Sequence, residues 1–74
     1  MVMQKEMSES LKEAARDAML QALMSGKTDA HIGGKFPSFS VSADKNAQLG
    51  INMGNLSLMS DGIEMTFYVF QRLA

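Results

Sequence analysis

Cysteine is absent from the 74 residues of this chain, and there is a single histidine, His31. Without cysteine the chain has neither a disulfide nor a thiolate ligand for zinc, and one imidazole cannot assemble the usual histidine-rich metal site. The four aspartates and four glutamates do not follow the spacing of a calcium loop either. The sequence therefore predicts no metal site and no cofactor.

Long apolar runs and basic tracts are also missing. No stretch approaches the roughly 18 apolar residues of a membrane-spanning helix. Residues 1–10 are polar where a signal peptide would have an apolar core, so we expect a cytoplasmic protein without membrane contact. The net charge is −1 and the seven lysines and arginines are dispersed. Because phosphate binding depends on several basic side chains acting together, nucleic acid is not an expected partner.

The chain is short even for a single domain, and we expect one domain over residues 1–74. A domain of this size has a small core, and natural examples often gain stability from disulfides, a metal or a second copy. Because the first two are excluded, we expect a homodimer or a complex with a larger partner.

An amphipathic helix is predicted from about residue 7 to 25. Ser10 and Glu13 have the spacing of a capping box, with Ser8 as an alternative cap, and Gly26 is placed to end the helix. The apolar residues recur at steps of three and four on one side: Met7, Leu11, Ala14, Ala15, Ala18 and Ala22.

The end of this helix has a second apolar surface. Leu20 and Met24 project from its charged side, and Leu23 lies near them. Two interpretations are open. Either the connection from Lys27 to Lys35 folds back over these side chains, or they dock on a second protomer or a target protein.

From Phe36 onward the apolar period changes from 3.6 to 2, which predicts four strands at about 36–43, 47–53, 56–60 and 63–72. A three-residue loop at 44–46 and two-residue turns at Gly54-Asn55 and Asp61-Gly62 predict consecutive hairpins. The predicted fold is α+β: a single N-terminal amphipathic helix packed on one face of a four-stranded antiparallel β-meander. The face toward the helix would contain Phe39, Val41, Leu49, Ile51, Met53, Leu56, Leu58, Ile63, Met65, Phe67 and Val69.

The opposite face combines small polar side chains with Tyr68 and Phe70. It is either the solvated side of the sheet or a flat contact surface anchored by these two aromatic residues. In a meander the strand at 63–72 lies at the edge of the sheet and is longer than its neighbour at 56–60. Residues 69–73 would therefore lack a pairing strand. We therefore predict a homodimer through this strand or through the surface of Leu20, Leu23 and Met24.

The connection from Lys27 to Lys35 is the only segment that suggests ligand chemistry. Gly33 and Gly34 allow backbone N–H groups to turn toward an anion, and Lys27, His31 and Lys35 lie nearby in the sequence. This makes the connection a candidate site for a small anionic ligand such as a nucleotide. It has no P-loop spacing, and its glycines precede a strand instead of opening a helix, so a flexible solvated loop is the alternative.

The sequence shows no arrangement typical of an enzyme. Nothing resembles a nucleophile elbow or an oxyanion-hole turn, and we expect no catalytic residues. The main hypothesis is a noncatalytic, homodimeric protein-interaction module that binds another protein as an inhibitor, adaptor or assembly factor. Small accessory proteins of viruses and mobile elements are often of this kind. The second hypothesis is a binder or sequestering protein for a small anionic ligand at residues 27–35.

Overall fold

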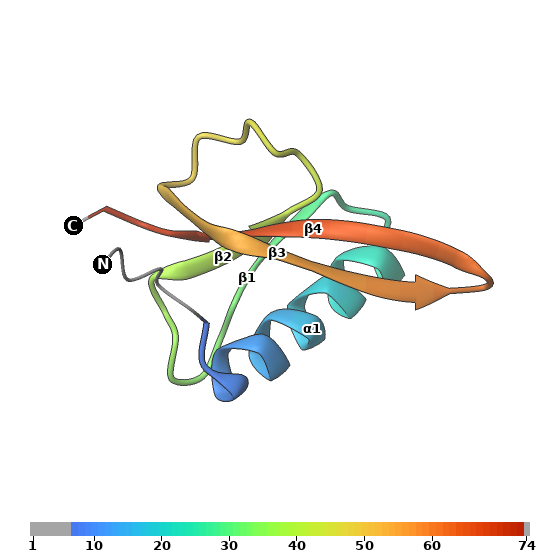
Figure 1. The fold of residues 1–74 in the computed structure, drawn as a ribbon, viewed down its shortest axis with the longest axis horizontal. Helices are drawn as coiled ribbons and strands as arrows, with labels where there is room; N and C mark the ends of the chain where they lie inside the picture. Colours follow the sequence, from blue (N-terminus) through green and yellow to red (C-terminus); the bar gives the residue numbers. More distant parts are fainter. Residues whose placement is uncertain (1–6, 74) are drawn as a thin grey trace, which may run out of the picture.

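In the computed structural model, which describes residues 7–73, one helix lies across one face of a four-stranded sheet (Figure 1). The loop 43–50 arches over the opposite face. The elements are α1 (Glu9–Met24), β1 (Asp29–His31), β2 (Phe39–Ser42), β3 (Ile51–Ser60) and β4 (Ile63–Gln71). The predicted α+β class, with an N-terminal helix on an antiparallel sheet, is confirmed.

Both ends of α1 are capped by local interactions. The Ser8 side chain accepts a hydrogen bond from the Leu11 N–H at 3.1 Å, so Ser8 is the N-cap and the predicted capping box at Ser10 and Glu13 is wrong. At the other end Gly26 has a φ of +67°, and the Lys27 N–H donates to the Ala22 carbonyl at 2.8 Å. This is a Schellman motif, and the predicted stop at Gly26 is confirmed.

The strand order is β1-β2-β4-β3, with every neighbouring pair antiparallel. It differs from the predicted meander in two respects. The segment 29–31, predicted as part of a loop, is a strand, and β2 pairs with β4 instead of β3. The predicted hairpin at 44–46 is therefore wrong: Val41 lies opposite Ala30 and Val69, not Leu49. A turn does form there, with the Asn46 N–H bonded to the Asp44 carboxylate at 2.9 Å, but it leads into the loop 43–50.

Residues 51–53 and 56–60, predicted in two separate strands, belong to one strand, β3, and the turn predicted at Gly54-Asn55 is wrong. Residues 47–50 of the predicted strand 47–53 lie in the loop 43–50. The place of the predicted turn is taken by a β-bulge between Asn52 and Gly54, where the register against β4 shifts. Gly54 has a φ of +139°, and a Cβ on it would lie 3.2 Å from the Met7 Cε. Gly54 is therefore a glycine inside a strand where another part of the chain comes close to the backbone, as is common at bulges.

The turn at Asp61-Gly62 is confirmed. Both residues have positive φ, +52° and +76°, as a type I′ turn requires. The resulting register places Ser60 opposite Ile63, and it continues as predicted with Leu58 opposite Met65 and Leu56 opposite Phe67.

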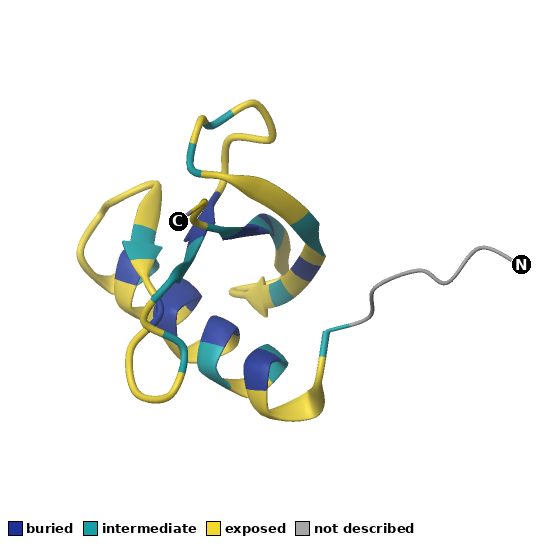
Figure 2. Ribbon diagram, turned by 90° about the vertical axis from the view of Figure 1, so that its left-hand side faces the viewer, coloured by how far each residue is buried: buried dark blue, intermediate teal, exposed yellow. Residues whose placement is uncertain are grey.

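The core lies between α1 and the sheet (Figure 2). From α1 it contains Leu11, Ala15, Ala18, Met19 and Ala22, and from the sheet and loops Ile32, Val41, Leu56, Phe67 and Val69. Four residues of the predicted apolar face pack on this core while partly exposed: Phe39, Met53, Leu58 and Met65. Leu49, which was predicted on the same face, lies in the loop 43–50. Ile51 and Ile63 are 50% and 62% exposed, contrary to prediction. Ile63 begins β4 at the tip of a hairpin that extends past α1 (Figure 1).

Within residues 7–73 no helix combines the length and the hydropathy that a membrane span requires.

Candidate functional site

The segment predicted as an anion-binding loop is built around strand β1. Lys27 and Lys35 lie beyond its opposite ends, and each lines a different hollow on the surface. Gly33 and Gly34 line the same hollow as Lys35, while His31 borders both. The five residues predicted to surround one anion are therefore not brought to one point, because an extended strand separates the two lysines.

Within residues 7–73, the outer edge of β1 has backbone groups without a backbone partner. On its inner edge the Ile32 N–H donates to the Phe39 carbonyl at 2.9 Å, and the Thr28 carbonyl accepts from the Ala43 N–H at 2.8 Å. In an antiparallel ladder the residues that bond to the neighbour alternate with those that do not. Asp29 and His31 consequently turn their N–H and C=O groups away from β2, toward the free edge of the sheet.

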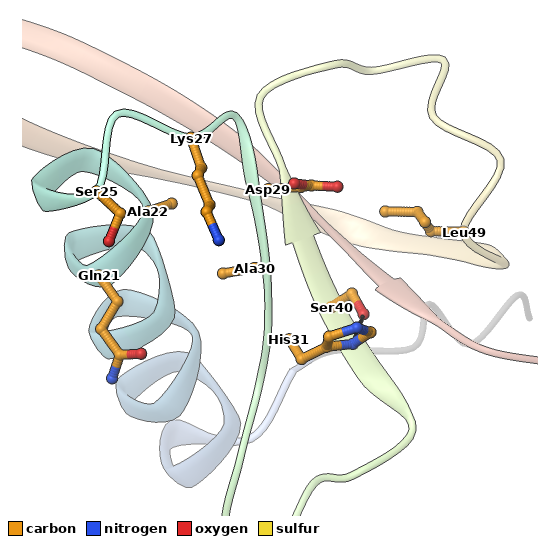
Figure 3. Close-up of a pocket in the computed structure, with 9 residues that line it drawn as sticks. All are labelled: Gln21, Ala22, Ser25, Lys27, Asp29, Ala30, His31, Ser40 and Leu49. Carbon is orange, nitrogen blue, oxygen red and sulfur yellow. Dashed lines mark hydrogen bonds between the residues drawn. The ribbon is translucent and has the colours of Figure 1, made fainter.

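A hollow of about 450 Å³ lies at this edge (Figure 3). On one side it is bordered by Gln21, Ala22, Ser25 and Lys27 at the end of α1, and on the other by Asp29, Ala30, His31, Ser40 and Leu49. Ala30 packs on the core, whereas the His31 Nδ1 and the Ser40 Oγ meet at 3.2 Å on the opposite face. Since residues from both faces line it, the hollow lies beside β1, where a further strand would lie.

A second hollow, of about 380 Å³, continues in the direction of Gly33. It shares Gln21 and His31 with the first. Its remaining lining residues are Ala14, Asp17 and Ala18 of α1 and Gly33, Gly34 and Lys35 of the following loop. We refer to the two hollows together, bordered by α1 and the free edge of β1, as the β1 groove.

Charges in the β1 groove are balanced. One hollow contains Lys27 with Asp29, and the other contains Lys35 with Asp17. A site for a small anion concentrates positive charge and N–H donors at one place. Each half of the β1 groove instead pairs one lysine with one aspartate, which favours a ligand of low net charge.

The five residues predicted to contact a partner differ in exposure. Leu20 and Met24 are 43% and 85% exposed, so residues 27–35 do not fold back over them. Leu23 is half-buried and packs against the core, and Tyr68 is also half-buried. Phe70 is 2% exposed, so its predicted role as a surface anchor is wrong. It lies opposite Ser40 and Asn52 on the face over which the loop 43–50 arches (Figure 1).

Strand β4 is not an edge, contrary to prediction. Tyr68 to Gln71 pair with β2 on one side, and the whole strand pairs with β3 on the other. A further hydrogen bond of 2.7 Å, from the Arg72 N–H to the Ser38 carbonyl, extends this pairing beyond the strand. Tyr68 to Gln71, which include most of the segment predicted to lack a neighbour, are therefore bonded on both sides.

In the part of the chain that the structure describes, the second free edge belongs to β3, a strand of ten residues. It contains no charged residue and no proline, and Ile51 and Met59 are 50% and 65% exposed. Because Ser60 and Ile63 close a two-residue turn, they form a hydrogen-bonded pair, and the alternation along the ladder turns the N–H and C=O groups of Asn55, Ser57 and Met59 outward.

The free edges of β1 and β3 were not predicted from the sequence. For β3 a signal was present, because no charged residue occurs from Asn46 to Ser60. For β1 the signal was the alternation around Ala30, with β-branched Thr28 and Ile32 flanking it, which is weak in a segment of this length.

Among residues 7–73, no three His, Cys, Asp or Glu side chains are grouped closely enough to hold a metal ion. No protein-family model matches the chain, and searches of curated proteins and of solved structures found no match.

Proposed function

We propose that this chain is a noncatalytic protein-interaction module of the cytoplasm, which forms a homodimer and acts by binding another protein as an inhibitor, adaptor or assembly factor. The observation that supports the dimer is the free edge of β3, ten residues long without charge or proline. Natural edge strands are usually short, or protected by lysine, proline or a covering segment, because unprotected edges pair with other chains.

A second copy is the occupant that suits β3. Two identical edges pair antiparallel about a twofold axis, so that one patch meets itself. Asn55, Ser57 and Met59 would then bond to backbone groups of the partner, over a strand about 33 Å long. The result would be one continuous sheet of both protomers, with the exposed Met59 side chains adding apolar contact.

The variant Ser57→Lys tests this dimer. Ser57 is exposed at the edge, and a lysine there places like charges near each other across the seam. Sedimentation velocity should show a dimer for the natural sequence and a dissociation constant at least about fivefold higher for the variant. Thr66→Lys is the matched control, because Thr66 lies opposite Ser57 on β4, one strand further from the proposed seam, and its side chain contacts that of Ser57. A natural chain that is monomeric at high micromolar concentration would refute the proposal.

The helix-end surface predicted from the sequence is the alternative seam. Leu20→Glu combined with Met24→Glu places two charges on it while leaving β3 unchanged. We expect the dimer to persist in this double variant. Dissociation here, together with no effect of Ser57→Lys, would move the interface to α1.

The alternative function, binding of a small anionic ligand by residues 27–35, has no structural observation in its favour. Lys27 and Lys35 line different hollows, each with an aspartate. A thermal-shift screen against nucleotides checks this directly, since a ligand at one hundred times its dissociation constant raises stability by about 2.7 kcal/mol.

A further inference from the structure

We infer that the β1 groove binds an extended peptide segment of another protein, which adds to the sheet as a fifth strand beside β1. The inference rests on the proposed function as a protein-interaction module, for which it supplies the class of partner. It does not depend on the dimer through β3, which lies at the other edge of the sheet.

Among residues 7–73, the outer backbone groups of β1 have no backbone partner. Asp29 and His31 each direct an N–H donor and a C=O acceptor into the groove, as the bonds of Thr28 and Ile32 to β2 require. An extended peptide satisfies all four groups at once, and main-chain bonds of this kind supply the affinity when a peptide pairs with a sheet edge. β1 contains no proline and no bulge that would prevent this pairing.

The position and size of the groove also suit an added strand. A strand pairs about 4.8 Å from its neighbour in a sheet. The hollow beside β1 is lined from both faces of the sheet and from α1, so it occupies the place of such a strand (Figure 3). The second hollow continues past His31 toward Gly34 and lengthens the groove along the direction of β1.

The lining of the groove indicates the chemistry of the peptide. Ala14 of α1 and Ala30 of β1 are partly exposed apolar residues of the lining, so a side chain pointing toward α1 should be apolar. The two lysine–aspartate combinations, Lys27 with Asp29 and Lys35 with Asp17, disfavour a strongly acidic or strongly basic segment. The expected ligand is therefore an extended segment of low net charge with at least one apolar residue.

A second copy of the chain does not suit this groove. Its own β1 would arrive with α1 beside it, because the end of α1 and the edge of β1 border one hollow. Pairing two β1 edges would bring two helices into the same space. A peptide segment without an attached helix enters without this conflict.

The test begins with selection of phage-displayed random linear peptides on the full chain, followed by affinity measurement on the selected peptides by fluorescence anisotropy. His31→Pro removes an outward N–H without removing a bond of the ladder to β2. We expect it to weaken binding by about tenfold or more. His31→Ala is the matched control, because it also loses the contact with Ser40 but keeps the N–H, and we expect its affinity to stay within about twofold of the natural chain.

Amide hydrogen exchange on the natural chain supplies a second readout, which holds even if His31→Pro does not fold. The selected peptide should slow exchange at Asp29 and His31. The inference is overturned if no peptide is selected, or if the selected peptides bind His31→Pro unchanged and protect amides elsewhere. Sedimentation of the same samples separates the two proposals: a monomer that binds peptide at β1 overturns only the dimer, and a dimer without peptide binding overturns only this inference.

Discussion

The two free edges of the sheet expose the same kind of backbone groups in different surroundings. β1 has three residues, with Asp29 and His31 at its edge and α1 alongside. β3 has ten residues, none of them charged. The long uncharged edge of β3 can pair with the same edge of a second copy. The short edge of β1, bordered by α1, has room for one added strand only. The comparison shows that an unpaired strand does not by itself define its partner; length, charge and neighbouring elements do.

The difference arises from how each strand is anchored. β1 follows the Schellman motif at Gly26, which turns the chain immediately after α1 and keeps β1 close to the helix end. β3 is held by the Asp61-Gly62 turn and by β4, and the hairpin extends past α1 (Figure 1). One edge is therefore associated with the helix, and the other with the hairpin.

The largest expected effect concerns the entry into β3. Gly50 has a φ of +130°, and a Cβ there would collide with the backbone carbonyl of Gln71 in β4. Gly50→Ala should therefore lower the free energy of unfolding by more than about 3 kcal/mol, measured by urea denaturation. Gly33→Ala, beyond the end of β1, is the control: its Cβ meets no atom within 4 Å, and we expect a change below about 0.5 kcal/mol. Equal stability of the two variants would show that β3 is not anchored through Gly50.

A smaller effect distinguishes the edges directly. If β3 is the dimer seam, amide exchange of Asn55, Ser57 and Met59 should slow by about tenfold or more as the protein concentration is raised through the dimer range. The amides of Asp29 and His31 should show no such dependence in the absence of peptide. If amide exchange slowed with protein concentration at Asp29 and His31 and not in β3, the dimer would form through β1, contrary to the proposal.

The smallest expected effect is the salt dependence of the dimer. Because Ile51–Ser60 contains no charge, raising the salt concentration should change the dimer dissociation constant by less than about twofold. Peptide binding at the β1 groove, bordered by Lys27, Asp29, Lys35 and Asp17, should respond more. A strongly salt-dependent dimer would indicate that a charged surface forms the seam.

Features that depend on neighbouring residues were predicted well. The helix, its stop at Gly26 and the turn at Asp61-Gly62 follow from local rules of backbone conformation, and the structure confirms all three. The turn predicted at Gly54-Asn55 from local rules is wrong, because the positive φ of Gly54 belongs to a bulge. The same local signal has two solutions, and the pairing of β3 with β4 on both sides of Gly54 distinguishes them.

The sequence by itself determined the α+β class, the apolar side of the helix and the register of the last hairpin. Periodicity and turn chemistry specify these features over a few residues. Only the tertiary structure decided that β4 is central, that Phe70 is buried, and that β1 and β3 are the free edges. The physical reason is that a strand's alternation specifies which residues share a face but not which strand lies beside it. That choice depends on how β2, β4 and the loop 43–50 pack together over the whole chain.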